Sequence, residues 1–394
     1  LIMACSVLLS RFMGLVRDKV ISFYYGASLE SDVYFASFVI PDFLNYLLAG
    51  GYFSITLIPL LSGYFAKDEE QGWRFFSCVL TWVGVSIGLL TVAAMVGAPW
   101  IAPLAAPGFG EEQLVTLVRF LRIILPAQVF FLLGSCFTAL LYLQKRFTVP
   151  ALTPLVYNGC IIVGGLLFLD RGDRGMEGFC WGVLVGSLVG NFLLPVLAVL
   201  MGEKGEGLRS RFRFFVEPSH AGLRRFVLLA LPLMVGQSVV VLDEQLLRVF
   251  GSMASEGAVS WLNYARRILF VPVGVVAQAA GVASYPFLAQ LIAKDDVTRF
   301  NETLNTALRN SLICIVPMGA YLMVAAQPVV QLLFEQGAFG AADTQATAVC
   351  LRIMLVTLFC WAIQQIIGRA FYARTNTLLP SLTGTLVALL SIPM

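Results

Sequence analysis

Long apolar stretches dominate the chain, and short polar segments separate them. The apolar stretches are about 18 to 30 residues long, enough for a helix to cross roughly 30 Å of bilayer hydrocarbon. Several are longer than a single crossing requires, so we expect tilted or bent helices. The pattern predicts eleven membrane-spanning helices, at residues 1–25, 31–65, 74–104, 114–143, 147–169, 175–201, 224–250, 256–292, 303–333, 344–373 and 377–394. The expected fold class is an all-α polytopic membrane protein.

Composition agrees with this class and argues against an enzyme. Charged residues make up 12% of the chain and mean hydropathy is +0.85, whereas about 25% of a soluble domain is charged. The eight cysteines form no C-x-x-C pair, and we interpret them as small buried apolar residues. With one histidine and no phosphate-binding loop, the chain lacks the motifs of His-based catalysis and of ATP-driven transport. We therefore expect a transporter, and we expect no nucleic acid among its partners.

Basic residues gather in alternate loops. The loops after the second, fourth, sixth, eighth and tenth spans carry thirteen lysines and arginines, and the other loops carry little beyond Arg171 and Arg174. Positive loops stay in the cytoplasm, so we expect these loops and the N-terminus to be cytoplasmic. The connector 203–223 is predicted either as an amphipathic helix on the inner leaflet or as a solvated linker.

The chain also repeats itself at an offset of 227 to 230 residues. Residues 59–69 (PLLSGYFAKDE) resemble 286–296 (PFLAQLIAKDD), and the later matches are Phe109-Gly110 with Phe339-Gly340, 121–123 with 351–353, Tyr142 with Tyr372, and Pro150 with Pro380. Because the offset spans six helices, we expect two parallel six-helix lobes around a central cationic cavity. The lobes are predicted at 1–202 and 224–394, the second one incomplete. Gly178, Gly182, Gly186 and Gly190 form a stripe that is typical of close helix packing.

Arginines within the expected spans are the candidate functional residues. An arginine at the bilayer centre costs about 2.5–3.5 kcal/mol on insertion scales, so Arg11, Arg17, Arg266 and Arg267 should face a wet cavity or a partner. Excess positive charge there predicts an anionic substrate, and guanidinium suits phosphate. For Arg17 with Asp18, and for Arg122, an internal structural contact is an equally open interpretation.

Three motifs resemble the MurJ (MviN) family of the multidrug/oligosaccharidyl-lipid/polysaccharide exporter superfamily. They are residues 10–18 (SRFMGLVRD) followed by Gly26, Ser31-Asp32 and Pro41, residues 260–267 (SWLNYARR), and residues 371–380 (FYARTNTLLP). The resemblance covers the whole chain and implies a fourteen-helix flippase for lipid II in the bacterial inner membrane, acting in peptidoglycan biosynthesis as a monomer. It assigns substrate handling to Arg11, Arg17, Asp32 and Arg267, and a sodium-ligand role to Asp243. No other cofactor is expected.

The chain departs from the family pattern at several charged positions. Asn45-Tyr46 replaces an Arg-Arg pair, Gly50 replaces a Glu, and Arg266 and Phe270 replace an Asp and a Glu. Arg266 would then supply the lost positive charge, or the substrate is a different polyprenyl-diphosphate glycan. Two further alternatives stay open: a cation or drug antiporter of the same superfamily, and a non-transporting partner in an envelope assembly. The repeat also predicts that the chain ends inside the fifth helix of its second unit.

Overall fold

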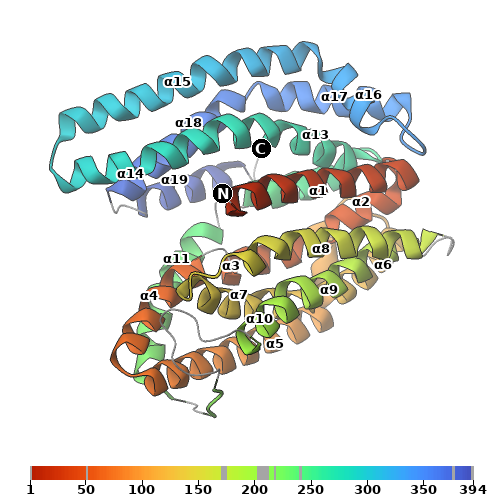
Figure 1. Ribbon diagram of the computed structural model, residues 1–394. Helices are drawn as coiled ribbons and strands as arrows, with labels where there is room; N and C mark the ends of the chain where they lie inside the picture. Colours follow the sequence, from red (N-terminus) through yellow and green to blue (C-terminus); the bar gives the residue numbers. More distant parts are fainter. Residues whose placement is uncertain are drawn as a thin grey trace. The chain divides into compact units, whose positions relative to one another are not determined.

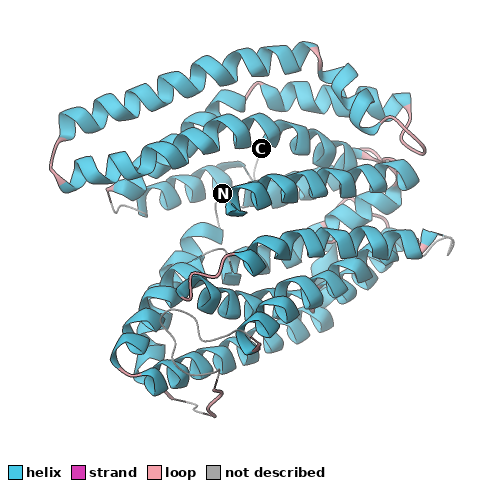
Figure 2. Ribbon diagram, viewed as in Figure 1, coloured by secondary structure: helices cyan, strands magenta, loops and turns pink. Residues whose placement is uncertain are grey.

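The computed structural model describes residues 2–49, 52–169, 175–201, 213–216, 219–238, 242–374 and 378–391. Every regular element within these ranges is a helix (Figure 2), which confirms the all-α class. The chain forms two compact units, residues 1–20 with 33–253, and residues 21–32 with 254–394. The N-terminal helix α1 (Ile2–Tyr25) contributes to both units.

The first unit holds most of α1 and the helices that follow it (Figure 1). They are α2 (Leu29–Ala36) from residue 33 onward, α3 (Val39–Ala49), α4 (Tyr52–Lys67), α5 (Glu69–Ala105), α6 (Glu111–Ile124), α7 (Ala127–Leu143), α8 (Thr148–Leu167), α9 (Glu177–Gly186), the π-helix η2 (Ser187–Leu193), α10 (Leu194–Leu200), α11 (Ala221–Ser238) and α12 (Leu242–Ser252). The compact unit thus includes α11 and α12, which the repeat assigns to the second lobe. The lobe boundaries drawn from the repeat stay a prediction.

Aromatic side chains build the core of the first unit. Trp73 and Phe76 of α5 and Phe137 of α7 are at most 5% exposed, and their rings meet edge to face. Phe226 of α11 belongs to the same cluster. Rings of this size bury about 150–250 Å² each, so they dominate the stability of the interior. Helix α5 starts at an N-cap, Asp68, whose carboxylate accepts a hydrogen bond from the Glu70 backbone N–H at 3.1 Å.

The glycine stripe of α9 and η2 packs directly against α8. A Cβ built on Gly182 would lie 2.6 Å from Ile161 Cα, and one on Gly186 would lie 2.8 Å from the Tyr157 carbonyl oxygen. Across the pair, a Cβ on Gly164 would lie 2.8 Å from Gly182 Cα. The two backbones are therefore too close for any side chain at these positions, which confirms the packing role expected of the stripe.

The second unit contains the end of α1 and the helices from residue 258 onward. They are α13 (Ala258–Pro272), the π-helix η4 (Val273–Gln278), α14 (Ala279–Ala293), α15 (Val297–Val324), α16 (Ala326–Phe334), α17 (Ala341–Leu355), α18 (Leu358–Ala373) and α19 (Leu378–Ser391). Helices α14, α15 and α18 pack side by side (Figure 1). The rings of Tyr264, Phe334 and Phe339 are buried together, with centroids 4.8 to 6.1 Å apart.

Matching residues of the sequence repeat make matching contacts within their own units. Arg122 Nε of α6 donates to the Met95 carbonyl of α5 at 3.3 Å. Arg352 Nε of α17 donates to the Met323 carbonyl of α15 at 3.2 Å. The two acceptors are 228 residues apart, close to the offset found in the sequence. Arg122 and Arg352 thus share a structural contact, which favours the structural interpretation of Arg122.

Fewer helices satisfy the length and hydropathy of a single span than the eleven expected from the pattern. In the described part of the chain six helices do so, and α17 with α18 makes a seventh if this pair, bent by 48°, counts as one span. The expected span 31–65 contains a break within the described residues, because α2 ends at Ala36 and α3 begins at Val39. Hydrophobic content does not show where a helix ends, so the pattern merged α2 with α3.

The amphipathic helix considered for connector 203–223 falls largely outside the described residues. Of its described residues, 213–216, 219 and 220 are not helical, and 221–223 are the start of α11. The backbone N–H of Phe215 donates to Ser77 Oγ of α5 at 3.1 Å, and the Arg74 guanidinium lies 5.0 Å from the Phe215 ring centroid. This part of the connector therefore contacts α5 within the first unit.

Candidate functional site

The arginine and aspartate at the middle of α1 form an ion pair that reaches α8. Arg17 Nη2 lies 2.9 Å from Asp18 Oδ1, and Asp18 is fully buried. Arg17 Nη1 also donates to Asn158 Oδ1 of α8 at 3.4 Å. Removing one partner of a buried pair leaves an uncompensated charge. These contacts favour the structural interpretation that the sequence left open for Arg17.

Arg11 lies two turns before this pair on an exposed part of α1, in the first unit. Its separation of seven residues from Asp18 places both on the same side of the helix. Arg11 and Arg17 are therefore close along α1, but the Arg17 side chain is partly buried and Arg11 is exposed.

Asp32 caps the start of α13 within the second unit. Its Oδ2 accepts from the Gly257 N–H at 2.7 Å, and its Oδ1 accepts from the Ser260 N–H at 2.8 Å and from Ser260 Oγ at 2.6 Å. The residue is 1% exposed. Negative charge is favourable at a helix N-terminus, where backbone N–H groups lack partners. The sequence predicted substrate handling for Asp32, and the structure adds a cap role that the sequence did not indicate.

Arg266 and Arg267 lie on α13, in the second unit and partly buried. The Arg266 guanidinium carbon lies over two rings, 4.9 Å from the Phe270 centroid and 5.8 Å from the Trp361 centroid of α18. Phe270 follows Arg266 by one turn, the spacing at which helical side chains meet. The two replacements at 266 and 270 noted in the sequence are thus direct neighbours.

A second charge network, joining α3 to α12, was not predicted as a unit. Arg248 Nη1 lies 2.7 Å from Asp42 Oδ2, and Arg248 Nη2 lies 2.9 Å from Glu244 Oε1. Arg248 is 7% exposed. The four-residue spacing of Glu244 and Arg248 could have predicted their ion pair from the sequence. The pairing of Arg248 with Asp42 depends on the fold. The side chain of the adjacent Asp243, the expected sodium ligand, lies outside the described residues.

One of the other family departures has a visible partner. Asn45 Nδ2 of α3 donates to Gln128 Oε1 of α7 at 3.1 Å. Gly50 and the side chain of Tyr46 lie outside the described residues. The Asn45–Gln128 contact shows that position 45 now serves packing of α3 on α7 within the first unit.

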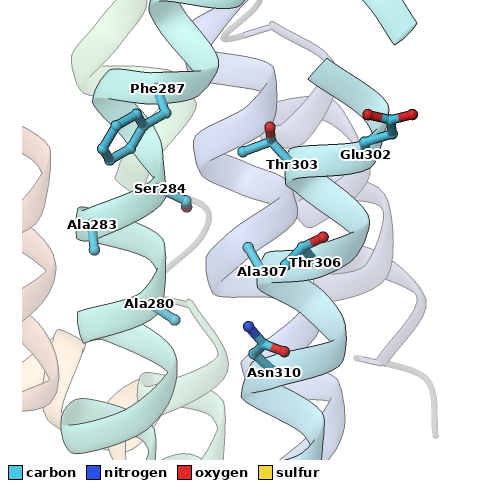
Figure 3. A pocket seen from close by; sticks show the side chains of 9 residues that line it. All are labelled: Ala280, Ala283, Ser284, Phe287, Glu302, Thr303, Thr306, Ala307 and Asn310. Atoms are coloured by element: carbon cyan, nitrogen blue, oxygen red, sulfur yellow. The ribbon is translucent and has the colours of Figure 1, made fainter. Parts of the chain in front are cut away.

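A groove of about 550 Å³ runs between α14 and α15 (Figure 3). Ala280, Ala283, Ser284 and Phe287 line one wall, and Glu302, Thr303, Thr306, Ala307 and Asn310 line the other. Counting from the matched caps Asp68 and Asp296, Thr303 and Thr306 correspond to Phe75 and Cys78, which are fully buried in the first unit. In the first unit, α11 packs on α4 and α5. The groove contains none of the expected substrate residues and corresponds to a helix-packing surface.

Comparison with known proteins identifies the chain's relatives. A family model described as "Lipid II flippase MurJ" matches residues 21–394. The "Probable lipid II flippase MurJ" of Buchnera aphidicola from Acyrthosiphon pisum is 29% identical over 391 residues, covering 98% of this chain and 74% of the relative. The "Lipid II flippase MurJ" of Burkholderia cenocepacia is 28% identical over 381 residues, covering 95% and 72%.

Solved structures give the same fold. A structure titled "Lipid II flippase MurJ, inward closed conformation" matches with a TM-score of 0.83 at 26% identity, over 98% of this chain and 79% of that one. An inward-facing multidrug resistance MATE family transporter of the MOP superfamily matches with a TM-score of 0.71 at 14% identity, over 98% and 94%. The second match establishes a shared fold only. Together they confirm a polytopic helical membrane protein.

Proposed function

Because the chain belongs to the MurJ lipid II flippase family, we propose that it moves lipid II from the cytoplasmic to the periplasmic leaflet by alternating access. The family is one of transporters, so the chain is a transporter and not an enzyme. The proposed substrate carries a diphosphate between its polyprenyl tail and its saccharide. The observation that carries this proposal is the set of arginines on membrane helices, Arg11 on α1 and Arg266 with Arg267 on α13.

Guanidinium groups suit this substrate for a physical reason. Each presents a planar set of N–H donors that can bind two phosphate oxygens at once. An arginine within the hydrocarbon region costs free energy unless it serves a polar function. Arg17, held by Asp18 and Asn158, meets that requirement through its own contacts. We assign Arg11 and Arg267 to the headgroup because they lie in the motifs at residues 10–18 and 260–267 that resemble the flippase family.

Two substitutions test the assignment. Arg11→Ala and Arg267→Ala should each abolish flipping while the protein still inserts at normal levels. Arg299→Ala is the matched control, because this exposed arginine sits in the first turn of α15 outside the proposed site. Flipping is measured by cleavage of periplasmic lipid II with a lipid II-degrading colicin. Normal flipping by both single variants would refute the role of these arginines.

The same assay tests the function itself. The chain is expressed in a strain depleted of its own lipid II flippase, and growth and colicin cleavage are followed. Rescue with restored cleavage is the expected result. Well-inserted protein without rescue would favour a flippase for another polyprenyl-diphosphate glycan. The replacements at Asn45 and Phe270 are the observations that support this second candidate. Cell-surface polysaccharide would then be analysed.

A cation or drug antiporter is the weaker alternative. The likeness to MATE transporters is at 14% identity, which supports the fold alone. Antiport of a cation requires carboxylates that can exchange protons or ions at mid-membrane. Asp18 and Asp42 are each paired with an arginine within the first unit. Proton- or sodium-driven efflux of an organic cation from loaded vesicles would be the result that favours an antiporter.

A further inference from the structure

Arg266, Phe270 and Trp361 form a compact stack, called here the Arg266 stack. The two rings are 5.2 Å apart between centroids and meet at 69°, so they form two walls against which the guanidinium rests. Phe270 comes from the same helix as Arg266, and Trp361 comes from α18. All three side chains are partly buried. The stack therefore restrains the arginine from two directions.

Contacts of this kind restrain a guanidinium through its charge. Attraction between a cation and the face of an aromatic ring strengthens as water is removed, so it is effective inside a membrane protein. Because this attraction acts between the positive charge and the ring, it uses none of the N–H donors of arginine. An arginine held in this way loses little further conformational freedom on binding an oxyanion.

The position of the stack along the chain is also informative. The π-helix η4 begins at Val273, directly after α13, and packs against α18. Short π-helical segments within longer helices occur frequently at functional sites. Arg266 and Phe270 thus occupy the last two turns before this irregular segment, and Trp361 belongs to the helix that supports it.

We propose that Phe270 and Trp361 are positioning residues that hold the Arg266 guanidinium ready to bind the phosphate oxygens of a polyprenyl diphosphate. This inference rests on the proposed function, since it assumes a diphosphate-linked lipid as the substrate. It extends that function by adding Arg266 to the arginines that bind the diphosphate and by naming the two rings that orient it.

The test is a binding measurement on the purified protein with undecaprenyl diphosphate, a probe that carries no saccharide. Trp361→Leu and Phe270→Leu should each raise Kd about fivefold, as expected for a lost cation–π contact. Arg266→Lys keeps the charge but loses the planar fork, and it should raise Kd about tenfold. Trp361→Phe keeps a ring and should stay within about twofold of the wild type. Phe359→Leu, an exposed aromatic of α18, is the matched control.

Coupling separates positioning from simple packing. If the rings act through the arginine, Arg266→Ala combined with Trp361→Leu should weaken binding no more than about twofold beyond Arg266→Ala alone, because no guanidinium is left for the ring to position. The proposal would be overturned if the Kd changes of the two single variants multiply in the double variant. It would also be overturned if Trp361→Leu lowers the unfolding temperature but leaves Kd unchanged, which would make the stack a packing contact. Wild-type protein that fails to bind the probe would instead remove the proposed function, and this inference with it.

Discussion

Individual charged residues of this chain carry structural contacts that the sequence alone does not reveal. Asp32 is the clearest example, because its carboxylate accepts three hydrogen bonds at the start of α13. Arg17 is another, because it joins Asp18 to Asn158. Loss of activity after substitution of either residue would therefore not by itself indicate substrate binding. Measurements of stability have to accompany measurements of transport at these two positions.

The Asp32 cap can be tested directly. Asp32→Ala should lower the free energy of unfolding by about 1–3 kcal/mol, since it leaves buried N–H donors without partners. Asp32→Asn keeps one oxygen acceptor and should lower it less. Thermal unfolding in detergent measures both, and Glu30→Ala, an exposed residue of the same helix α2, serves as the control. Unchanged stability in Asp32→Ala together with lost flipping would show that the residue acts on the substrate instead.

At the scale of helices, small residues and irregular segments decide how elements meet. The glycine stripe brings α9 and η2 against α8 with no side chain between the backbones. Two π-helical segments, η2 and η4, interrupt spans that the hydrophobic pattern treats as continuous. The pattern therefore locates the spans, and the contacts within each unit decide where they bend.

The α8–α9 contact yields a prediction with an internal control. Gly182→Ala should lower the unfolding free energy by about 1–3 kcal/mol, because the added methyl group overlaps the α8 backbone. Gly159→Ala on α8, where an added Cβ meets nothing within 4 Å, should raise stability by about 0.5–1 kcal/mol through the higher helix propensity of alanine. Thermal unfolding of the two variants in the same detergent provides the comparison. Equal effects at the two glycines would contradict the packing assignment.

At the scale of the molecule, the duplication and the topology are the main features. Arg122 and Arg352 donate matching hydrogen bonds, so the same contact between an arginine side chain and a carbonyl of a neighbouring helix occurs in each unit at the same place in the repeat. Orientation in the membrane is a separate matter, because it depends on loop charge and on no contact within the units. The cytoplasmic placement of the basic loops stays a prediction.

Cysteine labelling in whole cells tests this orientation. A cysteine at Lys67, the exposed end of α4, should react with a membrane-impermeant maleimide only after the cells are opened. A cysteine at Glu111, the exposed start of α6, should react in intact cells. Labelling is read on the peptide that carries each new cysteine, because the chain has native cysteines. The opposite pattern would reverse the assigned topology and the direction of flipping.

The sequence by itself determined the fold class and the family, and it contains the internal repeat from which two lobes are predicted. These depend on hydrophobic content and on local motifs such as residues 10–18, all of which can be read along one dimension. Only the tertiary structure decided which charges meet. Arg248 with Asp42, Asp32 with Ser260, and Arg266 with Trp361 join residues that are about 90 to 230 positions apart. Such pairings arise from the packing of helices, and the spacing of residues along the chain does not encode them.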